Sequence, residues 1–182
     1  HQQNIVPVVH QALRKANIDK KQLSAIAFTQ GPGLMGSLLV GTSFSKSLAM
    51  GLGIPLIAVN HMQAHILAHF IKAEGQTAPT FPFIALTISG GHTQIVKVTD
   101  YFEMEILGET IDDAVGEAFD KSAKILGLPY PGGPLIDKYA QSGNPLAYPF
   151  TKPKVGDLEF SFSGLKTAVL YFVERETKKN PN

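Results

Sequence analysis

The first part of the chain alternates between helical and strand-like apolar patterns. Apolar positions recur with a helical period over residues 5–16, and an apolar run over 24–29 predicts a buried strand. Residues 33–52 have the helical period again and predict a mostly buried helix that ends at Gly53. A second strand at 56–59 leads directly into another helix. The order strand, helix, strand, helix predicts a right-handed parallel crossover.

The pattern changes after residues 75–82, which hold two prolines and have little apolar periodicity. We therefore expect a first lobe at residues 1–80 and a second lobe at residues 81–182. The second lobe predicts an antiparallel meander followed by helices. Its expected elements are strands at 83–89, 93–98 and 103–109, an amphipathic helix at 111–126, a glycine turn with a short helix at 130–140, an irregular loop at 142–157 and a helix at 163–176.

Composition narrows the class of protein. The 182 residues contain no cysteine, which excludes disulfides and thiolate metal sites, and no apolar run is long enough to span a bilayer. We expect a cytoplasmic α/β protein. The net charge is +1, so we expect most of the docking surface for any RNA partner to lie elsewhere. The chain has no initiator Met and opens within a helical stripe, which we interpret as an excised fragment.

Three histidines lie four residues apart in NHMQAHILAHF, residues 60–70, a stretch that Asn60 is placed to cap as a helix. Residues at this spacing share one helix face, so His61 and His65 can bind one ion through neutral imidazoles, although a histidine-rich core helix explains the spacing as well. The first pair is favoured because the helix N-terminus disfavours imidazolium, and His69 is expected to be solvated. A zinc peptidase needs Glu after the first histidine, and Met62 is there instead.

Three glycine turns are candidates for anion binding. SGGHT at 89–93, GPG at 31–33 and PGGP at 131–134 each allow backbone amides to approach a phosphate closely. Each is explained equally well as a structural turn. Their number nevertheless favours a nucleotide or a phosphorylated ligand.

Acidic side chains give a second set of candidates. Asp113, Glu117 and Asp120 would form an acidic stripe on the helix expected at 111–126, and the simplest interpretation is a solvated face relieved by lysines. Asp120 or Asp137 could instead accept hydrogen bonds from ribose hydroxyls. In SFSGLK, residues 161–166, a serine is expected to cap the last helix.

Six strings of the sequence, taken in order, closely resemble the TsaD family. They are GPGLMGSLLVG, NHMQAH, SGGHTQ, DDAVGEAFDK, YPGGP and FSFSGLKT, and they cover nearly the whole chain. Members of this family are tRNA threonylcarbamoyladenosine transferases, once labelled O-sialoglycoprotein endopeptidases. The resemblance implies an actin-like ATPase (ribonuclease H-like) fold with two lobes, truncated here at both ends.

The resemblance also implies an activity and a set of site residues. The family transfers a threonylcarbamoyl group from threonylcarbamoyl-adenylate to the adenosine beside the anticodon of ANN-decoding tRNAs. By resemblance, His61 and His65 bind one iron or zinc ion, whose third ligand lies outside this chain. The glycine turns then present amides to the adenylate phosphate. The implied substrate-binding residues are Thr87, Ile88, Ser89, Gly90, Gly91, Asp120, Gly133 and Asp137.

The partners implied by the resemblance are tRNA, threonylcarbamoyl-adenylate, TsaB, TsaE and a TsaC-type synthase, with no membrane. TsaB would pair through helices such as 33–52, and the same helices leave a homodimer open as an alternative in its absence. The chain alone is expected to be inactive. The alternatives are a non-catalytic TsaB-like scaffold, a metallopeptidase that lacks its base, and an ATP-using kinase or ATPase that leaves the histidine pair unexplained.

Overall fold

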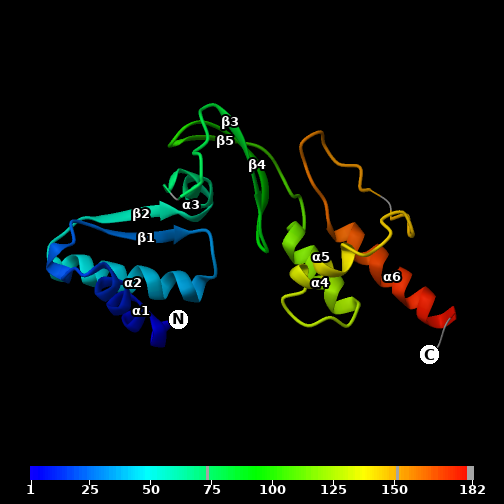
Figure 1. Cartoon of the computed structure of the whole chain (residues 1–182), viewed down its shortest axis with the longest axis horizontal. Helices are drawn as coiled ribbons and strands as arrows, with labels where there is room; N and C mark the ends of the chain where they lie inside the picture. Colours follow the sequence, from blue (N-terminus) through cyan, green and yellow to red (C-terminus); the bar gives the residue numbers. More distant parts are fainter. Residues whose placement is uncertain (73, 151, 180–182) are drawn as a thin grey trace. The chain divides into compact units, whose positions relative to one another are not determined.

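The computed structural model describes residues 1–72, 74–150 and 152–179. The chain divides into two compact units, His1–Ala78 and Pro79–Asn182, which we call the first and the second unit. Figure 1 shows the elements of each unit along the chain. None of the helices in the described part of the chain combines the length and apolarity needed to span a bilayer.

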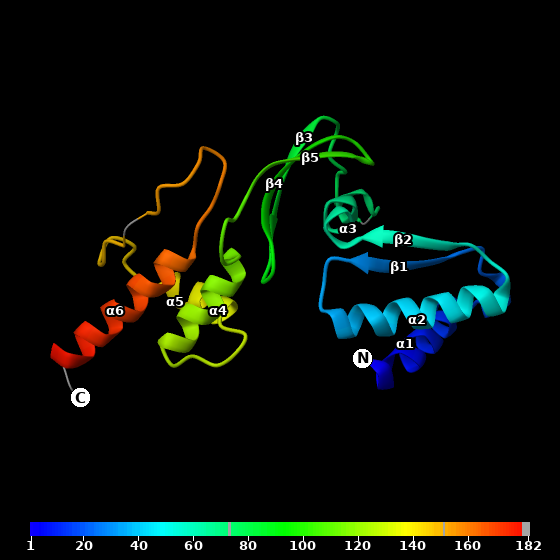
Figure 2. The ribbon, with the colours of Figure 1, turned by 180° about the vertical axis from the view of Figure 1, so that it is seen from behind.

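The first unit is a parallel two-stranded ribbon with helices packed against it (Figures 1 and 2). Strands β1 (Ile26–Gly31) and β2 (Leu56–Asn60) pair in parallel, as the crossover pattern predicted. Helices α1 (Gln2–Ala16) and α2 (Met35–Leu52) end at left-handed residues, Asn17 and Gly53, as expected for helix C-termini. A 3-10 turn, η1 (Lys20–Gln22), joins α1 to β1.

Helix α2 is less buried than its apolar composition predicted. Ser45 and Ala49 are its buried residues, and Leu38, Phe44 and Leu48 are half-buried. Leu34, just before the helix, and Met50 near its end are 80% and 83% exposed, and Met35 and Leu39 are exposed too. The expectation of a mostly buried helix was wrong for this face, because no helix or strand among the described residues of the first unit covers it. The result is an exposed apolar strip along α2.

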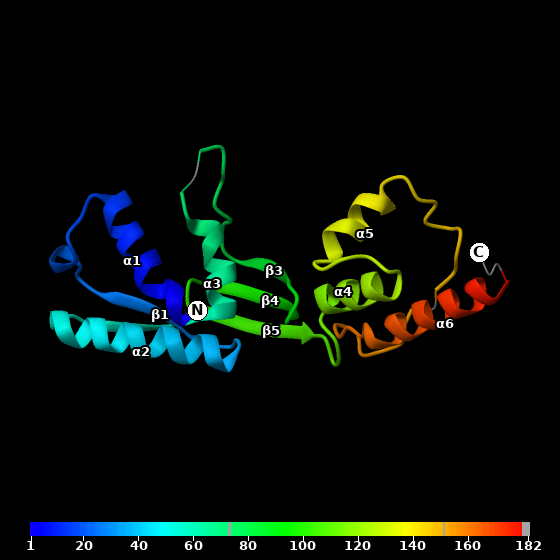
Figure 3. The same cartoon turned by 90° about the horizontal axis from the view of Figure 1, so that it is seen from below.

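The second unit begins with the predicted antiparallel meander (Figure 3). Strands β3 (Phe83–Ile88), β4 (Thr93–Asp100) and β5 (Glu103–Glu109) pair in sequence order. Val96 and Val98 of the central strand are buried, whereas Ile84, Leu86 and Ile88 on the other face of β3 are exposed. One face of the sheet is therefore buried at these two valines, whereas the other face is exposed along β3.

Three helices follow, α4 (Val115–Ile125), α5 (Gly133–Ala140) and α6 (Ser163–Lys179), with α4 in contact with both of the others. The expected helix at 111–126 therefore begins four residues late, and Asp113 does not belong to it. Its inward face is narrower than predicted: Ala114 and Ala118 are buried, but Phe119 is 43% exposed. The region predicted as an irregular loop, 142–157, contains no helix or strand in its described residues.

Candidate functional site

The two favoured histidines lie together at the start of α3 (His61–Leu67) in the first unit. Asn60 caps this helix as predicted, because its side-chain oxygen accepts hydrogen bonds from the amides of Met62 at 2.9 Å and Gln63 at 3.1 Å. The cap fixes the backbone of the first turn, from which the His61 side chain projects. One helical turn later, His65 brings its Nε2 atom to 3.2 Å from Nε2 of His61.

This geometry fits a shared metal ion. Zinc lies about 2.0–2.1 Å from imidazole nitrogen, so an ion bound to two Nε2 atoms 3.2 Å apart makes an N–metal–N angle of about 100–105°. That angle is close to tetrahedral. The two rings meet edge to face, with their centroids 4.5 Å apart, and an ion bound to both would lie between the two Nε2 atoms. His61 is half-buried and His65 exposed, which leaves that position accessible.

The third histidine does not join the pair. The α-helix ends at Leu67, and His69 lies in the 3-10 turn η2 (Ala68–Phe70), where the change of helical period takes it off the shared face. His69 is exposed, as expected for a solvated residue. Among the residues that the structure describes, no group of three His, Asp or Glu could hold a metal ion. The pair thus offers two ligands.

In the second unit, the predicted substrate loop is the turn between β3 and β4. Its Ser89 hydroxyl accepts hydrogen bonds from the amides of Gly91 at 3.3 Å and His92 at 3.0 Å. These two amides are therefore engaged within the turn, which differs from the expectation that the glycine turn presents free amides to a phosphate. Gly90 and Gly91 are exposed, and a side chain added at either would meet no atom within 4 Å. The turn offers open space for a ligand to approach its backbone.

Helix α4 begins directly against this turn. The buried Thr93 hydroxyl accepts a hydrogen bond from the Val115 amide at 3.0 Å, and the Ser89 carbonyl accepts one from the Gly116 amide at 3.2 Å. A Cβ atom on Gly116 would lie 2.6 Å from that carbonyl oxygen, so this close approach requires glycine. Thr93 acts as a helix cap supplied from 22 residues away, which sequence periodicity could not reveal.

The same helix holds the other glycine turn. Asp120 accepts hydrogen bonds on Oδ1 from the amides of Gly132 at 2.8 Å and Gly133 at 3.2 Å. These amides also donate within the protein, so the carboxylate predicted to bind ribose organises the N-terminus of α5. Asp137, on α5, is exposed, and its Oδ1 lies 3.5 Å from Nε2 of Gln141. In the second unit α4 thus contacts both predicted substrate loops, Thr87–Gly91 at its start and the Gly133 turn through Asp120.

Comparison with known proteins decides the family. The model of the family described as TsaD: tRNA N6-adenosine threonylcarbamoyltransferase matches residues 1–179. The chain belongs to the TsaD family. This membership confirms the resemblance found in the sequence, and with it the α/β, actin-like ATPase fold that was expected.

Relatives of this TsaD family member share the name of the enzyme. Proteins called tRNA N6-adenosine threonylcarbamoyltransferase from Christiangramia forsetii and Riemerella anatipestifer are 81% and 64% identical over 181 residues. Both matches cover the whole chain and 53% of the relative, so the chain spans about half the length of these curated proteins.

Solved structures are more distant. YeaZ from Pseudomonas aeruginosa is 18% identical over 97% of this chain and 78% of its own, with a TM-score of 0.43. A second structure, of an uncharacterized protein with similarity to peptidase YeaZ from the same species, is 24% identical with a TM-score of 0.41 over 59% of this chain and 49% of its own.

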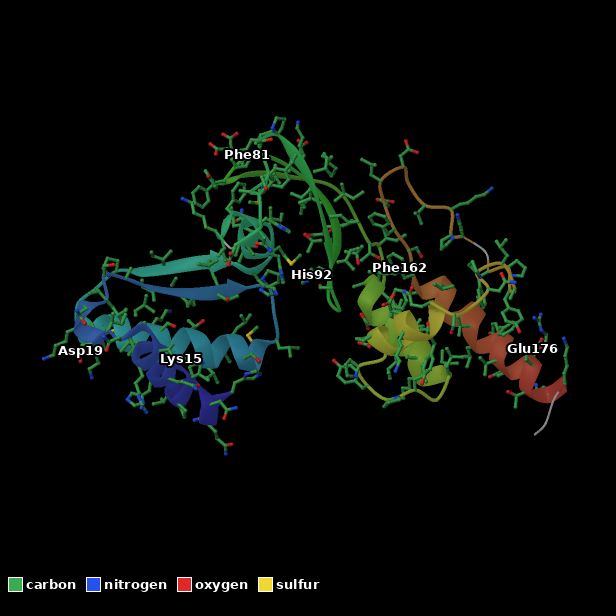
Figure 4. The ribbon with its side chains drawn as sticks, viewed as in Figure 1. Lys15, Asp19, Phe81, His92, Phe162 and Glu176 are labelled. Carbon is green, nitrogen blue, oxygen red and sulfur yellow. The ribbon has the colours of Figure 1, made fainter. Side chains whose placement is uncertain are left out.

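Two adjacent aspartates of this TsaD family member tie α4 to α6, a role that the sequence did not reveal. Asp112 accepts hydrogen bonds from the Ser161 hydroxyl and from the amides of Phe162 at 2.8 Å and Ser163 at 3.3 Å. It therefore caps α6 from a distance, where a serine was expected to do so. Figure 4 labels Phe162 at this junction. The sequence signal that could have revealed this capping role is the pair of acidic residues directly before a helix.

Two lysine side chains form ion pairs with the Asp113 carboxylate. Its oxygens lie 2.9 Å from Nζ of Lys121 and 3.2 Å from Nζ of Lys166, and Lys121 also pairs with Glu117 at 2.7 Å. Lys121 thus offsets the repulsion between these acidic side chains, as predicted, and Lys166 is held by the Asp113 carboxylate. The hydrogen bond from Lys121, followed by that from Lys166, lowers the pKa of Asp113, although burial opposes the shift. For Asp112, burial raises the pKa, but the bonds from Ser161, Phe162 and Ser163 outweigh it and lower the pKa.

These contacts predict that the second unit loses stability in acid. Both carboxyl groups have a folded-state pKa below their ordinary value of 3.8, so they stabilise the folded state above pH 3.8 and lose that contribution as pH falls further. We expect Asp113→Ala to lower the free energy of unfolding by about 1–3 kcal/mol at pH 7. Urea unfolding at pH 7, 5, 4 and 3 measures the difference in the free energy of unfolding between this variant and the unsubstituted chain. This difference should shrink below pH 3.8. A difference that stays constant to pH 3 would contradict this account.

Proposed function

We propose that the protein to which this chain belongs transfers a threonylcarbamoyl group from threonylcarbamoyl-adenylate to the adenosine beside the anticodon of ANN-decoding tRNAs. The observation that carries the proposal is the convergence of the His61 and His65 Nε2 atoms at 3.2 Å, in a chain of the TsaD family. In a scaffold without an ion, the same distance would be that of a hydrogen bond between the two rings. A peptidase needs a general base beside the first histidine, where Met62 stands.

His61 and His65 would hold one divalent ion, iron or zinc, as neutral imidazoles. Zinc sites that catalyse reactions commonly have three protein ligands, so a further ligand is proposed to come from outside these 182 residues. The ion supplies Lewis acidity, which makes a bound carbonyl a better electrophile. The protein contributes the Asn60 cap, which fixes the backbone of the first helical turn before any ion binds.

The second unit would bind the nucleoside part of the adenylate. Thr87, Ile88, Ser89, Gly90 and Gly91 form the loop whose open glycines permit close approach of a ligand. Asp120, Gly133 and Asp137 form the second contact region. Asp120 uses Oδ1 to hold the Gly132 and Gly133 amides, so its ribose contact is assigned to the other oxygen, Oδ2. Helix α4 keeps the two regions at a fixed separation.

The reaction needs no nucleophile from the protein. The exocyclic amine of the adenosine attacks the carbamoyl carbonyl carbon and forms a C–N bond. The C–O bond to the adenylate phosphate breaks, AMP leaves with the electron pair, and the amine releases a proton. The residues named above would bind and orient the two reactants so that amine and carbonyl meet.

The proposed partners are tRNA, TsaB, TsaE and a TsaC-type synthase that supplies the adenylate, all in the cytoplasm. The exposed apolar strip of α2, which includes Leu34, Leu39 and Met50, supports docking of TsaB on the first unit. A second copy of the chain could use the same strip when TsaB is absent.

The deciding experiment incubates the full-length protein with its partners, threonylcarbamoyl-adenylate and an unmodified ANN-decoding tRNA. Mass spectrometry of the digested tRNA should reveal threonylcarbamoyladenosine. A tRNA with guanosine in place of the target adenosine is the control and should stay unmodified. Cleavage of casein or of a glycoprotein, without tRNA modification, would support the peptidase and overturn the proposal.

A further inference from the structure

The net charge of +1 is the sum of opposite net charges on the two units. Residues 1–78 carry six Lys and Arg against two acidic residues, Asp19 and Glu74, which gives +4. Residues 79–182 carry ten basic against thirteen acidic residues, which gives −3. The expectation that RNA must dock mainly elsewhere assumed a uniform distribution of charge. The first unit by itself has an excess of positive charge.

Most of this charge is concentrated on one short segment. Arg14 and Lys15 lie in the last turn of α1, and Lys20 and Lys21 lie in η1, immediately after the left-handed turn at Asn17. We call these four residues the basic surface. Figure 4 labels Lys15 and, in the turn beyond α1, Asp19. Because seven peptide steps cover at most about 25 Å, all four cations fall within a few phosphate spacings of one nucleic acid strand.

These cations are available to a partner. All four side chains belong to exposed residues, and every ion pair among the described residues lies in the second unit. The one acidic residue within the segment, Asp19, accepts a hydrogen bond from the Lys21 amide at 2.9 Å and caps η1. The segment therefore keeps a net charge of +3.

The neighbouring surface of α1 suits a phosphate backbone. An open depression of about 600 Å³ is lined by Pro7, His10, Gln11, Arg14 and Lys15. The Gln11 amide and the His10 ring add further hydrogen-bond donors beside the cations. Amide, imidazole, guanidinium and ammonium groups together are the donors that proteins direct at phosphate oxygens.

We propose that the basic surface docks the sugar-phosphate backbone of RNA, independently of base sequence. The choice of RNA over an acidic protein rests on the proposed function, since a TsaD family member acts on tRNA. Contacts of this kind position the substrate and make its binding depend on salt, while base recognition occurs elsewhere.

The test measures binding of a fluorescein-labelled tRNA transcript to the 182-residue chain by anisotropy, from 50 to 300 mM KCl. The variant carries Arg14→Gln, Lys15→Gln, Lys20→Gln and Lys21→Gln. We expect its affinity at 100 mM salt to fall by at least about tenfold, and the slope of log K against log salt to shrink by about 2–4. A charge-preserving variant, with Arg14→Lys and the three lysines changed to Arg, should bind like the unsubstituted chain.

The matched control removes four exposed lysines of the second unit, Lys124, Lys138, Lys152 and Lys154, each changed to Gln. It alters the net charge equally and should retain affinity. The inference would be overturned by an equal loss of tRNA affinity in both variants, by no loss of affinity in the basic-surface variant, or by no tRNA binding by the unsubstituted chain. None of these results would change the outcome of the transfer assay, which tests the proposed function separately. Displacement of tRNA by poly-glutamate at equal charge concentration would assign the surface to acidic proteins instead. Thermal unfolding of each variant checks that it is folded.

Discussion

Replacing either His61 or His65 by alanine in the full-length protein is expected to abolish stoichiometric metal binding and threonylcarbamoyl transfer together. The two Nε2 atoms lie 3.2 Å apart, so each substitution removes one of the two ligands that this helix offers to an ion. Loss of a residue that only supports a ligand costs about 10–100-fold in metal affinity or activity, so loss of a ligand is expected to exceed about 100-fold. Metal content per chain is measured by plasma mass spectrometry, and transfer by nucleoside analysis.

His69→Ala is the matched control for this experiment. The residue is a histidine of the same segment, it is exposed, and it lies in the 3-10 turn away from the pair. Its substitution should leave metal content and transfer unchanged, and all three variants should unfold at similar temperatures. Normal metal content in His61→Ala or in His65→Ala would end the assignment of the pair as ligands. Loss of transfer with normal metal content would instead give the rings a role in binding substrate.

The histidine pair could be predicted because everything that makes it is local. A spacing of four residues and an Asn cap fix two neighbouring rings within one helical turn, and no distant residue is needed. The burial of α2 could not be predicted in the same way. An apolar period shows that a helix has an apolar face, but a single sequence does not show whether that face is covered within the same unit or left exposed, as Leu39 and Met50 are.

The start of α4 shows where local reasoning fails. The apolar period extends back to residue 111, yet the helix begins at Val115, whose amide is capped by the Thr93 hydroxyl. The residues before it are needed elsewhere, because Asp112 caps α6 and Asp113 binds Lys166 some 53 residues ahead. Glycine amides are engaged at both turns as well, those of Gly132 and Gly133 by Asp120 on α4 and that of Gly91 by the neighbouring Ser89. The sequence therefore located the candidate loops but mistook how their hydrogen bonds are made.

Gly132→Ala is expected to be among the most destabilising single methyl additions to the second unit outside its sheet. Gly132 is buried, and a Cβ atom there would lie 2.1 Å from Cβ of Ala123 on α4. Its φ of −83° suits alanine, so the cost comes from packing and not from backbone strain. Overpacking of a closed core typically costs about 1–3 kcal/mol, and we expect the upper end of this range in urea unfolding. The same change should weaken adenylate binding, because the Gly132 amide is held by Asp120.

A second substitution separates this clash from any general intolerance of the turn. Ala123→Gly removes the opposing methyl and by itself should cost about 1–2 kcal/mol, from helix propensity and one lost buried methyl. With both changes, the new methyl occupies the space that the old one left, so the double variant should be about 2 kcal/mol more stable than the sum of the single effects predicts. Gly164→Ala, in α6 with no atom within 4 Å of the added methyl, is the control and should be neutral or slightly stabilising. Strict additivity of Gly132→Ala and Ala123→Gly would mean that contact with the Ala123 methyl is not the source of the cost, and would contradict this account of the packing between α4 and the turn.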